Sequence, residues 1–185
     1  MSQQMVIIGA GLAGLSAACT AARQGWQVWL CSSLPSERAQ SVMAEGGINA
    51  ALDTQGQEDS PARHGADTLR AACGLADPNA VLAMTAAASA LVEELADLGV
   101  PFNRTADGQI DLRYFGGQKK KRTAFSQSDT GKQLMTALID AVRRYEAEGT
   151  VHRLNHHDFL TLLHDGPVCT GASLRDTWNG EDRKS

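Results

Sequence analysis

The first thirty residues contain two short apolar runs separated by a stretch of small residues. Residues 6–8 and 27–31 are mostly apolar and of strand length, and the small residues between them have the composition of a helix that packs closely. A glycine-rich turn connects the first run to the helix. Strand, turn, helix and strand in this order within about 30 residues predict a βαβ unit.

The middle of the chain has the spacing of apolar residues that is typical of helices. Ala and Leu recur at helical intervals and predict helices over residues 61–76, 79–98 and 131–148. Asp77 can cap the second helix and Gly99 ends it. Asp129 or Thr130 can cap the third. A hairpin is expected between residues 102–104 and 109–113, around Asp107-Gly108.

The last 35 residues are patterned as an antiparallel meander. Strands are predicted over residues 159–164 and 168–176, with a turn between them, and Asn179-Gly180 is a strong hairpin signal. Residues 181–185 are all charged or polar, and we expect them not to pair as a buried strand. The fold therefore reads as interrupted, as in a truncated gene product, a processed fragment or a deliberately cut chain.

The turn after the first strand has the pattern G-x-G-x-x-G, with Gly9, Gly11 and Gly14 at the glycine positions. Gly9 permits a sharp exit from the strand, Gly11 lets the backbone approach a pyrophosphate, and Gly14 lets the helix pack on the strand. The helix N-terminus offers N–H groups to phosphates. We therefore predict dinucleotide binding, against the alternative of an ordinary glycine-rich turn.

The residues at the end of the second predicted strand indicate which dinucleotide is expected to bind. A simple NAD site uses Asp or Glu there, whereas this chain has Cys31-Ser32-Ser33. Glu37 is the nearest acid and follows too late in a proline-containing loop. Ser32 or Ser33 could bind the ribose hydroxyls as neutral groups. Any bound dinucleotide is accordingly expected to be FAD rather than NAD(P).

A double glycine follows within a stretch of small residues, at residues 38–51. Here the chain resembles the flavoprotein subunits of the fumarate reductase, succinate dehydrogenase and L-aspartate oxidase family. The resemblance continues, in order, through residues 64–68, 98–102, 114–119, 122–123 and 128–131. It implies an α/β fold with a Rossmann-like, glutathione-reductase-like FAD-binding domain that carries inserted helices and a β-meander.

The resemblance also implies which residues hold FAD. The implied pyrophosphate loop is Gly9, Ala10, Gly11, Leu12, Ala13 and Gly14; the adenosine-ribose contacts are Ser32 and Ser33; the flavin-wrapping segment includes Gln40, Ser41, Ala44, Glu45, Gly46 and Gly47; and the adenine contacts are Asp158 and Phe159. Gly47 and Phe115 resemble positions that border a dicarboxylate pocket.

Gln40 departs from many relatives, which carry a histidine covalently attached to the flavin at the aligned position. An amide cannot form that bond, so the resemblance implies non-covalent FAD. Loss of the covalent link generally lowers the flavin potential. Fumarate reduction or an oxidase reaction is then favoured over succinate oxidation.

The resemblance covers only about the first third of such a flavoprotein. We expect residues 1–55 to form the βαβ unit and flavin-wrapping loop, residues 56–150 to be mainly helical, and residues 151–185 to begin the meander. The family's capping domain and catalytic residues follow this region, so no catalytic residue is named and the isolated chain is expected to be inactive. The expected partners are a small dicarboxylate and, for the full-length protein, an iron-sulfur electron-transfer subunit.

Composition and charge narrow the classes of partner that the chain is expected to bind. With 43% hydrophobic residues and a formal net charge of −4, the 185 residues suit a globular unit without affinity for nucleic acid. The basic run at residues 119–122 fits a solvated loop or, alternatively, a docking surface. No apolar segment of 18 residues predicts membrane insertion, which suggests a cytoplasmic protein, or a peripheral one at the inner face of a membrane through its partners.

The cysteines and histidines do not predict a metal site. Cys19, Cys31, Cys73 and Cys169 lack C-x-x-C spacing and are expected to be reduced and mostly buried. His156 and His157 are adjacent, so in a strand they would face opposite sides. The sequence therefore predicts no metal site.

Two further patterns leave choices open. His64 and Asp67 are one helical turn apart and could form an acid–base pair, but a helix-face hydrogen bond is the plainer interpretation. Residues 129–132 resemble the end of a phosphate loop, but Gln127 stands where that loop needs glycine, so they favour a helix cap. Besides the flavoprotein, an NAD(P)-dependent reductase and a non-catalytic dinucleotide-binding remnant remain as alternative functions.

Overall fold

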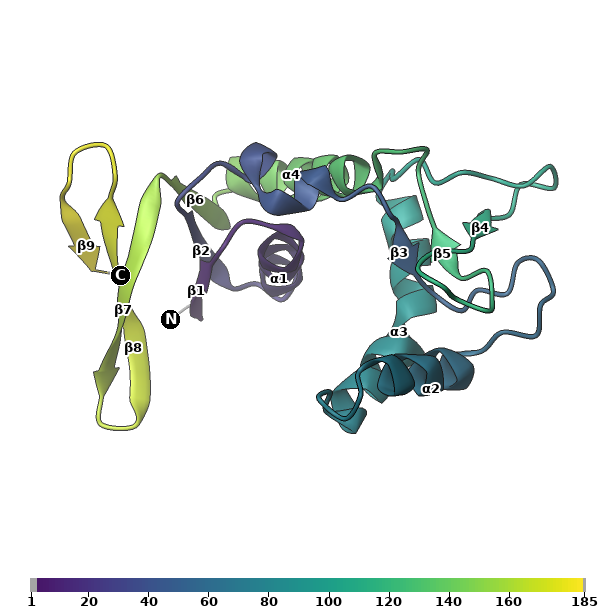
Figure 1. The fold of residues 1–185 in the computed structure, drawn as a ribbon. Helices are drawn as coiled ribbons and strands as arrows, with labels where there is room; N and C mark the ends of the chain where they lie inside the picture. Colours follow the sequence, from purple (N-terminus) through teal and green to yellow (C-terminus); the bar gives the residue numbers. More distant parts are fainter. Residues whose placement is uncertain (1–2, 185) are drawn as a thin grey trace. The chain divides into compact units, whose positions relative to one another are not determined.

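The structure is a computed structural model that describes residues 3–184, with side chains through residue 181. The chain divides into two compact units, shown as a ribbon in Figure 1. Unit 1 comprises residues 1–43 and 134–185, and unit 2 comprises residues 44–133. Each unit is described by itself.

Unit 1 is built on a parallel sheet. Strands β1 (Gln4–Ile8), β2 (Gln27–Ser32) and β6 (Val151–Asn155) lie in the order β1-β2-β6, and both pairs are parallel. Helix α1 (Leu12–Arg23) connects β1 to β2 and lies beside them (Figure 1). The predicted βαβ unit is confirmed, and the buried pattern of β2 fits its central position.

A second, antiparallel sheet in unit 1 forms the meander. Its strands are β7 (His157–Asp165), β8 (Val168–Asp176) and β9 (Asp182–Lys184), with β8 in the middle. Figure 1 shows β7 and β8 as a long hairpin. Ala172 and Leu174 of β8 pack with Cys31 of β2 in one buried cluster, which joins the two sheets.

The expectation for the last residues was wrong in one respect. Residues 182–184 form β9 and pair with β8, although their side chains are charged. The turn at residues 177–179 and the positive φ of Gly180 return the chain along β8, and backbone hydrogen bonds in a ladder do not require apolar side chains. Ser185 lies outside the described residues.

Two single-turn 3₁₀ helices and one long helix connect these sheets to the rest of the chain. They are η1 (Ser36–Arg38), η2 (Gln40–Met43) and α4 (Thr130–Ala147). Helix α4 begins in unit 2 and continues into unit 1. The Thr130 hydroxyl accepts a hydrogen bond from the Ser126 N–H at 3.1 Å, so Thr130 orders the turn that precedes the helix.

Unit 2 contains two helices that pack on each other, α2 (Pro61–Ala71) and α3 (Pro78–Asp97). Asp77 caps α3 by accepting from the Asn79 N–H at 2.8 Å, as predicted. Helix α2 ends five residues earlier than the predicted Ala76, because Cys73 and Gly74 adopt positive φ values of 50° and 83°. Left-handed backbone cannot continue an α-helix.

Unit 2 also has a small sheet of two-residue strands. These are β3 (Ile48–Asn49), β4 (Leu112–Arg113) and β5 (Thr123–Ala124), in the order β3-β5-β4. The hairpin predicted around residues 107–108 is only partly present: an isolated bridge joins Arg104 and Ile110. The chain continues past this turn so that residues 112–113 pair with β5 instead.

Helix α3 is long and apolar enough to cross a membrane, although the sequence predicted no such segment. It has 20 residues and a mean hydropathy of 1.2. Its buried residues are Val81, Thr85, Ala88, Val92 and Leu95, which lie three or four apart. One buried stripe of this kind is also typical of a helix that packs within a globular unit, so length and hydropathy alone are weak evidence.

Candidate FAD site

The glycine turn, residues 9–14, joins β1 to α1 in unit 1. Gly9 has φ +103°, and its N–H donates to the Cys31 carbonyl at 2.8 Å, which continues the β1–β2 ladder into the turn. A Cβ on Gly14 would overlap the Gly9 carbonyl oxygen. A Cβ on Gly11 would lie 3.2 Å from the Ser41 Oγ. The turn therefore leaves no room for a side chain at Gly14 and little at Gly11.

The first turn of α1 keeps its backbone donors available. Gly11 is the N-cap, no side chain caps it, and no acidic residue lies in the first turn. The Leu12 N–H is 3.4 Å from the Ser41 Oγ, a long hydrogen bond. Unpaired N–H groups at a helix start, next to a backbone without side chains, suit a phosphate. This geometry fits the pyrophosphate of a dinucleotide.

The structure brings Gly11 and Ser41 together, whereas among the described residues no hydrogen bond joins the turn to the other expected cofactor side chains of unit 1. The Ser32 hydroxyl donates to the Leu34 carbonyl at 2.6 Å. Asp158 and Phe159 lie on β7, where the Phe159 ring is 43% exposed. Within residues 3–184 no hydrogen bond joins these β7 residues to the glycine turn.

Glu37, the nearest acid after β2, has another contact. It accepts a hydrogen bond from Arg143 of α4 at 2.8 Å, and both side chains are about half exposed. The Glu37 carboxylate is therefore already paired with Arg143 on the surface of unit 1.

In unit 2, Gly46 and Gly47 form the core of what we call the double-glycine segment, residues 45–47. A Cβ on Gly46 would lie 2.8 Å from Cζ of Phe115. Gly47 has φ +114°, and a Cβ there would lie 2.5 Å from the Ala124 carbonyl oxygen. The structure thus brings Phe115 against Gly46, two positions that the sequence connected only through resemblance. Gly47 is required by its backbone contact and positive φ, whereas Gly46 leaves the space that the Phe115 ring fills.

Arg113 contacts the same segment, a role that the sequence did not predict. Its Nη2 donates to the carbonyls of Glu45 at 3.1 Å and Gly46 at 2.8 Å. The guanidinium carbon lies 4.5 Å from the centre of the Phe125 ring. No local pattern could have identified this role, because Arg113 is 67 residues from Gly46 along the chain.

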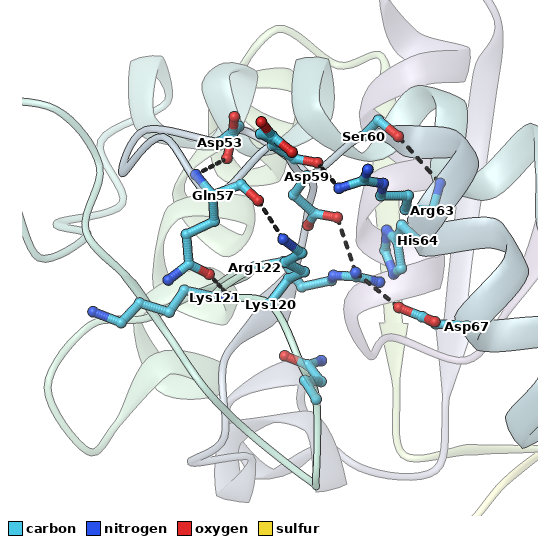
Figure 2. Close-up of polar contacts among 12 residues, drawn as sticks. Asp53, Gln57, Asp59, Ser60, Arg63, His64, Asp67, Lys120, Lys121 and Arg122 are labelled. Atoms are coloured by element: carbon cyan, nitrogen blue, oxygen red, sulfur yellow. Dashed lines mark hydrogen bonds and ion pairs between the residues drawn. The ribbon is translucent and has the colours of Figure 1, made fainter.

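Unit 2 contains a buried ion-pair cluster in which Arg122 contacts Asp59 and Asp67 (Figure 2). Arg122 is 2% exposed, and its Nη2 donates to Asp59 and to Asp67, each at 2.9 Å. The Arg122 carbonyl accepts from the Ala50 N–H at 2.7 Å, directly after β3. One residue therefore connects α2, β5 and the strand that follows the double-glycine segment.

The basic run at residues 119–122 is consequently not a uniformly solvated loop. Lys120 donates to the Gln57 carbonyl, and the Lys121 N–H donates to the Gln57 side chain at 2.8 Å. Lys121 also lies 5.9 Å from the centre of the Tyr114 ring. The part of the run nearest β5 is held by unit 2, because its last residue is the buried Arg122.

His64 and Asp67 do not form the expected helix-face hydrogen bond. The pKa of Asp67 is lowered, because the hydrogen bonds and charges of Arg122 and Arg70 outweigh the opposing effect of burial. His64 is buried, and its Nδ1 has no hydrogen-bond partner among the described residues. Burial, and then the charge of Arg122, lower the pKa of His64 below its usual value.

The cysteines are free thiols, but only two of the four are buried. Cys19 and Cys31 are buried, whereas Cys73 and Cys169 are exposed, so the expectation of mostly buried thiols was wrong for half of them. Cys73 lies in the left-handed turn after α2, and Cys169 lies in the outer part of the β7–β8 hairpin. Burial raises the pKa of Cys31 to about 11.

Comparisons with known proteins place these features in a family. Residues 4–185 match the family described as FAD binding domain. The chain is 42% identical over 181 residues to the succinate dehydrogenase flavoprotein subunit of Bacillus subtilis, covering 97% of this chain and 31% of that protein. It is 41% identical over 140 residues to an L-aspartate oxidase of Mesorhizobium japonicum, covering 75% of this chain and 26% of that protein.

Solved structures agree with the sequence comparisons. Mycobacterium smegmatis Sdh1 in complex with UQ1 has a TM-score of 0.91 at 28% identity, covering 97% of this chain and 32% of that chain. A quinol fumarate reductase of E. coli has a TM-score of 0.86 at 26% identity, covering 98% and 31%. The chain spans about a third of the length of these proteins. It belongs to the FAD-binding domain family, in the branch that includes the succinate dehydrogenase and fumarate reductase flavoproteins.

Proposed function

We propose that the chain is the FAD-binding part of a flavoprotein that transfers electrons or hydride between non-covalent FAD and a C4 dicarboxylate such as fumarate or succinate. The observation that carries the proposal is the glycine turn, where side chains are excluded beside an uncapped helix start. The family match supplies the cofactor. The names of the relatives supply the class of reaction.

In this proposal, the glycine turn holds the pyrophosphate through the N–H groups at the start of α1. Ser32 and Ser33 bind the adenosine ribose, and Asp158 and Phe159 hold the adenine through β7. Residues 40–47 wrap the flavin, with Ser41 beside Gly11 as the observed link to the turn. When bound, FAD supplies the redox chemistry, and the protein sets its orientation and environment.

The side chain at residue 40 determines how the flavin is attached. Gln40 begins η2, and an amide has no nucleophilic ring nitrogen with which to form a covalent bond to the flavin. Acid precipitation tests this point: the yellow flavin is expected in the supernatant, whereas flavin retained on the denatured chain would contradict the proposal. A Gln40→His variant is the matched comparison, because it restores a group capable of that bond.

The choice of dicarboxylate rests on unit 2. Gly47 and Phe115 are proposed to border the substrate pocket, and Phe115 is 52% exposed, so its ring has a free face as well as the one against Gly46. Relatives include a succinate dehydrogenase subunit, a fumarate reductase subunit and L-aspartate oxidases. Non-covalent flavin favours fumarate reduction or an oxidase reaction within that set.

The domain boundaries and partners belong to the same proposal. Residues 1–55 carry the βαβ unit and flavin loop, residues 56–150 the mainly helical part, and residues 151–185 the meander. The relatives are named as flavoprotein subunits, which is why we propose an iron-sulfur electron-transfer partner and a peripheral place at a membrane for the whole protein.

Turnover by the 185-residue chain alone is expected to be absent. Catalysis on a dicarboxylate needs groups that clamp both carboxylates, a proton donor and a flavin face shielded from water. The test is fumarate-dependent oxidation of a reduced viologen dye by the purified chain with excess FAD. A rate above that of free FAD would contradict this part of the proposal and direct attention to Arg104, Arg113 and Arg122.

A further inference from the structure

Arg113 binds two successive backbone carbonyls of the double-glycine segment. Its Nη2 donates to Glu45 at 3.1 Å and to Gly46 at 2.8 Å, and its guanidinium rests on the Phe125 ring. Among the described residues the buried Arg113 Nε has no hydrogen-bond partner, so the hydrogen bonds of this guanidinium to the double-glycine segment come from Nη2. Hydrogen bonds from a charged donor are stronger than neutral ones.

These contacts determine where the neighbouring N–H groups point. The peptide bonds of residues 45–47 are trans, as are all those of the described residues, and in a trans peptide the carbonyl and the following N–H point in opposite directions. The N–H groups of Gly46 and Gly47 share peptide planes with the two carbonyls that Arg113 binds. Both N–H groups therefore point away from Arg113, and within residues 3–184 neither donates to a protein acceptor.

Two successive N–H groups on one side of a backbone form a small concavity for an electron-rich group. Neither Gly46 nor Gly47 carries a side chain that could cover it, and Gly47 is exposed. Phe115 packs on Gly46 from the same short stretch that contains Arg113. Residues 113–115 thus hold the double-glycine segment through both a carbonyl clamp and an aromatic contact.

We propose that Arg113 is a positioning residue that directs the Gly46 and Gly47 N–H groups at the electron-rich edge of the bound flavin ring. This inference rests on the proposed function, in which residues 40–47 wrap the flavin. Reduction makes N1 and the carbonyl oxygens of the flavin ring better hydrogen-bond acceptors, whereas N5 takes up a proton and becomes a donor. The electron-rich edge is therefore the one that carries those acceptors. The oriented N–H groups, with the charge behind them, therefore bind reduced flavin more strongly than oxidised flavin.

The test compares the affinities of oxidised and reduced FAD. Calorimetry gives the dissociation constant of oxidised FAD. The difference in midpoint potential between bound and free flavin gives the ratio of the dissociation constants of the oxidised and reduced forms. Arg113→Met removes the charge and both donors, and Arg113→Lys keeps the charge but not the planar clamp. Arg104→Met is the matched control, because it removes an equal charge and a 3.2 Å contact to the Gly108 carbonyl elsewhere in unit 2.

We expect Arg113→Met to weaken the binding of reduced FAD about tenfold more than that of oxidised FAD, which lowers the midpoint potential. Arg113→Lys should give a smaller shift in the same direction, and Arg104→Met should leave the ratio unchanged. Equal weakening of both redox forms by Arg113→Met, as a purely structural role would produce, overturns the inference.

The outcomes separate the two proposals. If the unsubstituted chain binds no FAD, the proposed function fails. If it binds FAD and both Arg113 variants keep its potential, only the inference about Arg113 fails. Should Arg113→Met not fold, as judged by circular dichroism, Arg113→Lys decides alone, and an unchanged potential in that variant overturns the inference.

Discussion

The glycine turn of unit 1 and the double-glycine segment of unit 2 exclude side chains in different ways. Gly14 is constrained by the Gly9 carbonyl, only five residues earlier in the chain. Gly46 and Gly47 are constrained by Phe115 and Ala124, and Arg113 binds the segment from 67 residues away. The first region is shaped by local backbone geometry, whereas the second depends on long-range side-chain contacts. Substitution of Arg113 or Phe115 should therefore affect the second region and leave the packing at Gly14 unchanged.

The largest expected effect follows removal of Arg122, the buried arginine of unit 2. Arg122→Met leaves the fully buried Asp59 carboxylate without its cation, which should lower the free energy of unfolding by about 3–5 kcal/mol. Urea denaturation measures the loss. Arg143→Met breaks the exposed pair with Glu37 in unit 1 and should cost under about 1 kcal/mol. Similar losses in both variants would contradict the distinction between buried and exposed pairs.

The same contrast explains what the sequence could predict. The βαβ unit, the cap of α3 and the tight turn at residues 9–14 follow from spacing, because each depends mainly on neighbours within a turn or a strand. The binding of a pyrophosphate by that turn stays a prediction. Arg113 and Arg122 gave no such signal, because their partners are defined only after β3, β4 and β5 come together. Arg122 was instead assigned to a basic loop, since four consecutive cations are usually solvated.

A smaller effect is expected from adding one methyl group to each glycine region. Gly14→Ala should cost about 3 kcal/mol, because the rigid Gly9 carbonyl must move and α1 must shift from β1. Gly47→Ala should cost about 1–3 kcal/mol, since φ +114° is strained for alanine and the Ala124 carbonyl lies close. Thermal unfolding of the apo chains compares them. Gly166→Ala, in a turn where nothing lies within 4 Å of the added carbon, is the control for positive φ alone.

If Gly14→Ala proves no more destabilising than Gly166→Ala, the turn is more adaptable than its geometry indicates. The local explanation of the glycine turn would then be wrong.

The smallest expected effect is a pH dependence of stability from His64. Because the folded pKa of His64 lies below its usual value of 6.5, the unfolded chain takes up the proton first as the pH falls. Stability should therefore decrease as the pH falls through 6.5 toward the lower folded pKa, with Arg122, Asp59 and Asp67 as the charges that face the ring. His64→Gln should flatten this part of the profile, as measured by urea denaturation at each pH.

Substitution of an exposed histidine provides the control. His164→Gln, on the outer part of β7, should retain the slope of the unsubstituted chain. Identical slopes for the unsubstituted chain and His64→Gln would show that His64 does not titrate differently in the folded state.

The central claim is that the glycine turn binds FAD, and calorimetric titration of the purified chain with FAD and with NADH tests it most directly. The account predicts binding of FAD, no comparable binding of NADH, and loss of FAD binding in Gly11→Val. A branched side chain at Gly11 would occupy the space of the pyrophosphate, where even a Cβ lies 3.2 Å from the Ser41 Oγ. Tight binding of NADH with no affinity for FAD, or full FAD affinity in Gly11→Val, would contradict it.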